Sequence, residues 1–197
     1  MLYLITNRKL ALNKDFYNII DEAVRGGINA IILREKDLSS EELHKMAVKI
    51  KEIIGKKEVK LIINSNLKVA ESVEAHGFHT TFNSFINEKP CFNGSLGVSV
   101  HSVEEAIEAE RHGANYILFG HIFETNCKKD LPPKGLELLM AMKREVNIPV
   151  IALGGINPEN IKEVKKTGAD GVAVMSVIME AQRPYDLTKK YVFSMMY

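Results

Sequence analysis

The chain has 197 residues, of which 46% are hydrophobic and 26% are charged. This is enough to bury a core, and it fits one domain over residues 1–197 better than two. The formal net charge is +1 and the pI is about 7.8, so no overall field attracts nucleic acid or an anionic membrane surface. We therefore expect a small-molecule partner, with no nucleic acid and no membrane.

The N-terminus (MLYLITNRK) lacks the charged start, long apolar run and cleavage site of a secretory signal. No apolar run reaches the roughly 18 residues that would suggest a membrane span. Cys91 and Cys127 form no CxxC motif and no Cys/His cluster, which indicates a reduced compartment and no metal site. We expect a cytoplasmic protein.

Short apolar or β-branched runs recur along the chain, and most are followed by a stretch with helical periodicity. The predicted strands are residues 2–6, 30–34, 60–64, 77–79, 96–100, 116–119, 149–152 and 171–175. Alternating strands and helices are typical of a parallel sheet.

Helix signals separate the predicted strands. Residues 15–25 close at a pair of glycines, Ser39 and Ser40 cap a run to residue 54, and Ser102 caps residues 103–112. Asn157 and Pro158 are expected to open a further helix that ends near residue 168. The segment between residues 79 and 96 has room for at most a short helix.

Eight strand–helix units predict an α/β fold, a single-domain (β/α)₈ TIM barrel. The alternative is an open doubly wound sheet, which would need fewer strands and normally a glycine-rich first turn. The first predicted strand is followed by Asn7, Arg8 and Lys9 instead of GxGxxG. The barrel is therefore favoured, and its chemistry should lie at the carboxyl ends of the strands.

The predicted strand ends gather polar and basic residues. They include Thr6, Arg34, Lys36, Asn64, Asn66, His79, Ser99, His101, His121, Lys128 and Ser176. The other histidines, His44, His76 and His112, lie on or near predicted helices and are expected at the solvated surface. His101 directly precedes the capping Ser102 and need do no more than order that loop.

Residues 116–129 form an apolar run that reaches Gly120 and His121 and continues into a loop with two lysines. A histidine just past a buried strand is rigidly supported, and imidazole titrates near neutral pH, so it can transfer protons. The alternative is a structural, hydrogen-bonded histidine. Because Gly120 and Lys128 flank His121 at a predicted barrel mouth, we predict that it is catalytic.

Residues 33–37 (LREKD) carry alternating charges, so Arg34 and Lys36 should face one way and Glu35 the other. Two cations on one face suit a substrate with two acidic groups, because arginine binds carboxylate or phosphate through paired hydrogen bonds. The alternative is an ion-pair network at the barrel rim with Glu35 and Asp37.

The last two predicted strands end in small residues, within 150–156 (VIALGGI) and 171–176 (GVAVMS). Backbone N–H groups of Gly154, Gly155 and Ser176 can surround an anion there, at the usual phosphate corner of such barrels. The alternative is that the two glycines only form a tight turn. We predict a phosphate site.

Together these motifs resemble those of the thiamine-phosphate synthase/TenI superfamily over nearly the whole chain. The matching segments are residues 33–37, 61–64 (LIIN), 97–101 (GVSVH), 120–128, 151–156 and 169–176. The superfamily includes the magnesium-dependent synthase, which couples a pyrimidine diphosphate to a thiazole phosphate, and TenI, a thiazole tautomerase.

The chain departs from the synthase pattern at four positions. Ser65 and Ser84 stand where that pattern has aspartates, Phe82 replaces a glutamine, and His121 replaces a proline. Magnesium and a leaving diphosphate need hard carboxylate oxygens, so the expected metal site is lost. Residues 99–106 and 119–129 closely resemble TenI, in which the histidine corresponding to His121 is implicated in catalysis.

The resemblance implies a thiazole tautomerase of thiamine biosynthesis. It would isomerise the thiazole carboxylate phosphate with an exocyclic double bond to aromatic 2-(2-carboxy-4-methylthiazol-5-yl)ethyl phosphate, by proton transfer and without a cofactor or metal. His121 would be catalytic. The expected substrate-binding residues are Arg34, Lys36, Asn64, Ser99, Thr125, Lys128, Gly154, Gly155, Met175 and Ser176. Arg34, Lys36 or Lys128 would hold the carboxylate.

Two alternatives stay open: a divergent thiamine-phosphate synthase, or a non-catalytic regulatory protein that binds thiazole phosphates. Direct DNA binding is disfavoured by the +1 net charge and the lack of a concentrated basic helix. The resemblance also implies a homodimer. Apolar residues near the C-terminus should cap the barrel or line a subunit contact: Leu187, Tyr191, Phe193, Met195 and Met196.

Overall fold

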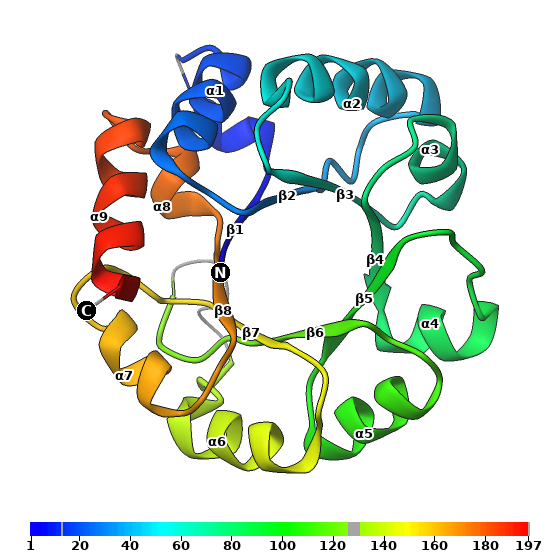
Figure 1. Cartoon of the computed structure of the whole chain (residues 1–197), viewed down its shortest axis with the longest axis vertical. Helices are drawn as coiled ribbons and strands as arrows, with labels where there is room; N and C mark the ends of the chain where they lie inside the picture. The colour runs from blue at the N-terminus through cyan, green and yellow to red at the C-terminus, as the bar shows by residue number, and fades with distance from the viewer. Residues whose placement is uncertain (13, 126–130, 197) are drawn as a thin grey trace.

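The computed structural model of the chain describes residues 1–12, 14–125 and 131–196. Eight parallel strands form a closed barrel in chain order, in which β8 pairs with β1 (Figure 1). The strands are β1 (Leu2–Ile5), β2 (Ala30–Leu33), β3 (Lys60–Asn64), β4 (Gly77–Thr81), β5 (Ser95–Val100), β6 (Tyr116–Gly120), β7 (Val150–Leu153) and β8 (Gly171–Val174). The predicted TIM barrel is confirmed, as are all eight strands, whose ends differ from the prediction by at most two residues.

Helices surround the barrel on the outside (Figure 1). They are η1 (Arg8–Ala11), α1 (Phe16–Gly26), α2 (Ser40–Ile54), α3 (Leu67–Ser72), α4 (Phe82–Glu88), α5 (Val103–Arg111), α6 (Gly135–Glu145), α7 (Ile161–Lys166), α8 (Ser176–Met179) and α9 (Pro184–Met196). The segment between β4 and β5 holds only the seven-residue α4, as expected. Within the described ranges, no helix combines the length and the apolar character needed to cross a bilayer.

The predicted starts of three helices are confirmed to within one residue. The side chains of Asp15, Ser39 and Ser102 accept hydrogen bonds from first-turn backbone N–H groups of α1, α2 and α5. The regular turns of α7 begin later than the predicted start at Asn157 and Pro158. The side chain of Asn157 nevertheless accepts hydrogen bonds from the N–H groups of Glu159 and Asn160. Asn157 therefore caps a hydrogen-bonded turn over residues 158–160, and the helix itself begins at Ile161.

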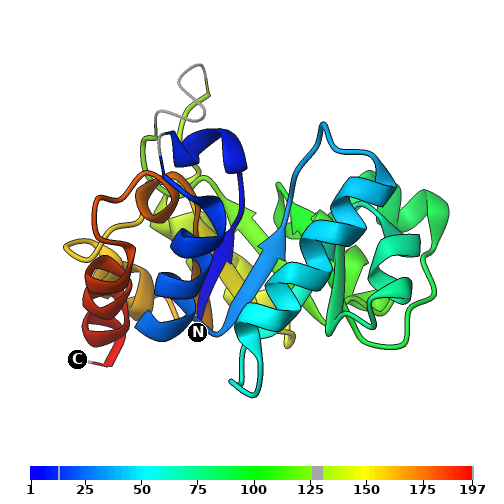
Figure 2. The same ribbon diagram turned by 90° about the horizontal axis from the view of Figure 1, so that it is seen from above.

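Successive side chains along each strand point to opposite faces of the sheet, so each strand contributes to two hydrophobic cores. One cluster fills the barrel interior: Tyr3, Ile5, Ala30, Ile32, Ile62, Tyr116, Leu118, Ile151 and Ala173. A larger cluster lies between the strands and the helices and includes Leu2, Leu4 and Ile31. The side view shows η1 at the end where the strands finish (Figure 2). Since the interior is filled, a ligand must bind at an end.

The C-terminal helix α9 lies in the outer ring against α1 and α7 (Figure 1). Tyr191 is fully buried there, and its hydroxyl donates to the carbonyl of Ile156 at 2.7 Å. This position contradicts the expectation that the segment caps the barrel. Phe193 and Met196 are 62% and 71% exposed, and the homodimer stays a prediction that sedimentation can test.

Thr188 offers a stability prediction within α9. It is fully buried, and its Oγ1 has no hydrogen-bond partner in the described part of the chain. Thr188→Val keeps the shape and removes the unpaired hydroxyl, so we expect the free energy of unfolding in urea to rise by about 1 kcal/mol. The matched control is Thr167→Val, because Thr167 Oγ1 donates to the Val164 carbonyl. That change should lower stability by about 1 kcal/mol, and a loss at both positions would contradict the prediction.

Candidate active site

A cavity of about 600 Å³ opens at the end of the barrel where the strands finish, within the size range of small-molecule sites. Its wall contains His121 and the predicted substrate-binding residues Arg34, Lys36, Asn64, Ser99, Thr125, Gly154, Gly155, Met175 and Ser176. The remaining one, Lys128, lies outside the described residues. The fold therefore brings these residues together from the ends of six different strands, while their individual roles stay predictions.

His121 follows β6 directly and is only 4% exposed, although it lines the cavity. Its Nε2 lies 3.1 Å from the carbonyl oxygen of Leu131. A carbonyl can only accept, so Nε2 carries a hydrogen in this pair. In the neutral ring Nδ1 then carries the lone pair, and it has no hydrogen bond to any residue that the structure describes. Among the described residues, this arrangement leaves one imidazole nitrogen available as a base.

Two glycines at the exit of β7 hold the His121 segment in place. Gly154 has a φ of +97°, and a Cβ there would lie 2.3 Å from the Cβ of His121. A Cβ on Gly155 would lie 2.5 Å from the carbonyl oxygen of Glu124. The backbone N–H of Phe123 donates to the Gly154 carbonyl at 3.1 Å. These glycines therefore permit close packing, a role that the predicted phosphate site does not require.

The same glycines retain the features that an anion site needs. Neither Gly154 nor Gly155 donates its backbone N–H to an acceptor among residues 1–12, 14–125 and 131–196. Ser176 begins the short helix α8 beside them in the cavity wall. The tight-turn alternative and the phosphate prediction are thus compatible.

The charged run after β2 separates as the alternation predicted. Glu35 is 7% exposed and Asp37 lies at the surface, and both form ion pairs with Arg8, at 3.1 and 2.7 Å. Arg8 also holds the pKa of the Asp37 carboxyl well below its usual range. Arg34 and Lys36 line the cavity and form no ion pair with the described residues. The rim network exists, but its cations are Arg8 and Lys9, so the alternative assignment for Arg34 and Lys36 is wrong.

Thr6 belongs to this network and does not contribute to the cavity wall. It is fully buried, and its hydroxyl donates to Glu35 at 2.7 Å while accepting from the backbone N–H of Arg34 at 3.0 Å. The strand-end position of Thr6 therefore has a structural purpose: it anchors Glu35 and the backbone next to the cationic residues.

His79 is a buried wall residue that the predicted site omits. It is 2% exposed, with Nδ1 2.9 Å from the Tyr116 hydroxyl and Nε2 2.8 Å from Ser99 Oγ. Burial, and then the charge of Arg34, lower its pKa to about 3, so the ring is neutral at ordinary pH. A signal was available, because alternation along β4 sends Phe78 outward and His79 inward.

The lowered pKa of His79 predicts acid sensitivity. In the unfolded chain the ring has its ordinary pKa of 6.5, so between pH 6.5 and about 3 the unfolded state binds more protons. Stability should therefore fall as pH decreases through this window. Between pH 7 and pH 4 we expect the wild type to lose about 3 kcal/mol more than His79→Gln, measured by urea titration. Parallel pH profiles of the two proteins would contradict this.

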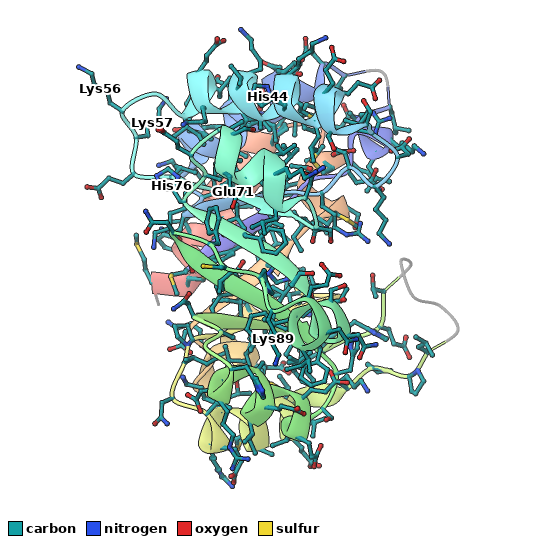
Figure 3. All side chains as sticks on the ribbon, turned by 90° about the vertical axis from the view of Figure 1, so that its right-hand side faces the viewer. His44, Lys56, Lys57, Glu71, His76 and Lys89 are labelled. Atoms are coloured by element: carbon teal, nitrogen blue, oxygen red, sulfur yellow. The ribbon has the colours of Figure 1, made fainter. Side chains whose placement is uncertain are left out.

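The other histidines lie where expected. His101 is exposed and lines the cavity, and its backbone N–H donates to Glu105 at 2.7 Å. Figure 3 shows His44 on the outer helix α2 and places His76, with Lys56 and Lys57, at the end where the strands begin. That end is opposite the cavity.

The described donor set does not fit a magnesium site. Ser65 lines the cavity, and Ser84 lies in the first turn of α4, where its N–H donates to Thr81. No Asp or Glu is among the described wall residues, and no three His, Cys, Asp or Glu residues of the described chain cluster in a way that could hold a metal. Magnesium prefers hard carboxylate oxygens, which these side chains do not supply.

The fold and cavity define a (β/α)₈ barrel with a small-molecule site at the carboxyl ends of its strands. Comparison with known sequences narrows this class, because the family profile described as thiamine monophosphate synthase (TMP-TENI) matches residues 2–178. The chain belongs to the thiamine-phosphate synthase/TenI superfamily, as its motifs predicted.

Known relatives resemble the chain over most of its length. It is 40% identical over 189 residues to a thiamine-phosphate synthase from Clostridium acetobutylicum, covering 94% of this chain and 90% of that protein. It is 41% identical over 182 residues to a thiamine-phosphate synthase from Ruminiclostridium cellulolyticum, covering 90% of this chain and 87% of that protein. A thiamine phosphate pyrophosphorylase structure from Pyrococcus furiosus superposes with a TM-score of 0.86 at 33% identity, covering 99% and 95%. These names favour the synthase alternative over the tautomerase.

Proposed function

We propose that this protein is a thiazole tautomerase, an isomerase of thiamine biosynthesis. The observation that carries the proposal is His121, a buried imidazole whose Nδ1 has no hydrogen bond to a described residue. It lies in a cationic cavity whose described wall has no carboxylate. Its substrate would be the thiazole carboxylate phosphate with an exocyclic double bond. Its product would be the aromatic carboxythiazole phosphate.

The proposed chemistry is a proton shift that needs no cofactor. His121 Nδ1 would take the proton from the sp³ ring carbon that bears the carboxylate, and a proton would be delivered to the exocyclic carbon. The ring then becomes aromatic, which makes the reaction favourable. A positioned imidazole suits this step because its proton affinity is matched to neutral pH.

The remaining wall residues would hold the two anionic groups of the substrate. Arg34 and Lys36, which no described carboxylate neutralises, would bind the carboxylate, with Lys128 as a further candidate. The N–H groups of Gly154 and Gly155, with Ser176 at the start of α8, would bind the phosphate. The substrate would thereby be fixed at both ends beside His121.

The second candidate is thiamine-phosphate synthase, which the names of the relatives favour. This transferase would join a pyrimidine diphosphate to a thiazole phosphate and release pyrophosphate with magnesium. Ser65 and Ser84 occupy the positions at which the synthase pattern has aspartates, so magnesium would need other ligands.

Two assays on the same protein separate the candidates. The first follows formation of the aromatic carboxythiazole phosphate by NMR, against a reaction without protein. The second measures pyrophosphate release from the pyrimidine diphosphate, thiazole phosphate and magnesium. We expect accelerated aromatisation and no pyrophosphate. Pyrophosphate release without aromatisation would establish the synthase, and binding of the thiazole without turnover would establish a regulatory protein; either result overturns the proposal.

A further inference from the structure

A series of two hydrogen bonds runs from the barrel interior to the cavity, through the side chains of Tyr116, His79 and Ser99. The strand register aligns His79 with Gly97 and Gly97 with Tyr116, so all three lie in one layer of the barrel. A Cβ on Gly97 would lie 2.1 Å from Cζ of Tyr116, so only glycine leaves room for the phenol ring. The ring can therefore cross β5 and reach His79 on β4. Ser99, two positions beyond Gly97, lines the cavity.

The direction of the first hydrogen bond follows from the burial of Tyr116. Its hydroxyl has one hydrogen-bond partner among the residues that the structure describes, Nδ1 of His79 at 2.9 Å. If Nδ1 donated, the phenolic hydrogen would lack an acceptor inside the barrel, and buried donors without acceptors are rare. The phenol must therefore donate to Nδ1.

The direction of the second hydrogen bond follows from the protonation state of His79. Burial lowers its pKa to about 3, so the ring is neutral and carries one hydrogen. With Nδ1 accepting, that hydrogen is on Nε2, which donates to Ser99 Oγ at 2.8 Å. Ser99 accepts this bond and has no other partner in the described chain, so its own O–H is left to donate.

We infer that Tyr116, acting through the tautomer of His79, sets the Ser99 hydroxyl as a hydrogen-bond donor toward the ligand. Ser99 is then a specificity-determining residue that selects a ligand with an acceptor at this point, such as a carboxylate oxygen or an unprotonated ring nitrogen. Tyr116 and His79 are positioning residues. Naming the carboxythiazole phosphate as that ligand rests on the proposed function. The direction of the two hydrogen bonds does not depend on the proposed function.

Imidazole nitrogen NMR tests the direction of the two hydrogen bonds without any substrate. In ¹⁵N-histidine-labelled protein, we expect the His79 ring, assigned by its loss in His79→Gln, to carry hydrogen on Nε2 and a lone pair on Nδ1. This pattern should hold from about pH 5 to about pH 9, because the pKa of His79 lies below that range and burial raises the pKa of the Tyr116 hydroxyl well above its ordinary value. A hydrogen on Nδ1 would overturn the inference.

Variants test the consequence for ligand binding. In Tyr116→Phe, Nδ1 of His79 has no partner in either tautomer, so we expect both tautomers in the spectrum. KM should rise about 5-fold, with a smaller change in kcat. Ser99→Ala should raise KM about 10-fold without disturbing Nε2 protonation. The matched control is Tyr3→Phe, which removes a hydroxyl that is not bonded to His79 and keeps the ring that packs edge-on against Tyr116. It should keep the wild-type tautomer and KM.

Calorimetry separates failure of this inference from failure of the proposed function. If the protein binds aromatic carboxythiazole phosphate but does not catalyse its formation, the tautomerase proposal fails, and the affinities of the same variants still test the role of Ser99. Wild-type affinity and tautomer in Tyr116→Phe, or equal losses in Tyr3→Phe, would overturn the inference.

Discussion

The variant His121→Asn is expected to fold and bind the thiazole phosphate like the wild type, yet to aromatise it at least about 100-fold more slowly. Asparagine places a polar group near the position of Nδ1 but cannot titrate near neutral pH, so it cannot accept the substrate proton. NMR time courses at saturating substrate measure the rate, and calorimetry with the aromatic product measures binding.

A second substitution separates proton transfer from positioning. His121→Gln can still present an N–H donor to the Leu131 carbonyl, which the Nε2 of His121 contacts at 3.1 Å. If the hydrogen bond to this carbonyl were all that mattered, the glutamine variant would retain activity. We expect it to be as slow as His121→Asn, and wild-type turnover by either variant would remove His121 from the mechanism.

Gly154→Ala is expected to reduce both activity and stability. The new Cβ would lie 2.3 Å from the Cβ of His121, and alanine would have to adopt a φ of +97°. Backbone strain and steric overlap together should cost about 2–4 kcal/mol of unfolding free energy. Displacement of His121 should lower kcat at least about 10-fold, because the imidazole must lie within hydrogen-bond distance of the substrate to transfer a proton.

Gly113→Ala provides a matched control for the backbone cost. Gly113 follows α5 with a φ of +91°, and no heavy atom lies within 4 Å of the position of its added Cβ. This variant should lose about 1 kcal/mol of stability and keep full activity. If both variants behave alike, the contact between Gly154 and His121 has no special role in holding the imidazole.

Much of the architecture was predictable because it depends on local patterns. Alternating apolar runs and helix signals specified eight strand–helix units, and Asp15, Ser39 and Ser102 marked helix starts correctly. The alternation of charges after β2 separated Arg34 from Glu35 correctly. The start of α7 was placed about three residues too early, because the turn that Asn157 caps is not yet regular helix.

The sequence by itself determined the barrel, the superfamily and the set of polar residues at its mouth, because parallel strands bring their carboxyl ends to one edge. Only the tertiary structure decided which of these residues act on each other. Arg8 pairs with Glu35, Gly154 packs against His121, and Gly97 lets Tyr116 reach His79. Each contact joins different strand–helix units, and its partner depends on barrel register and on space between side chains, which no local pattern along the chain records.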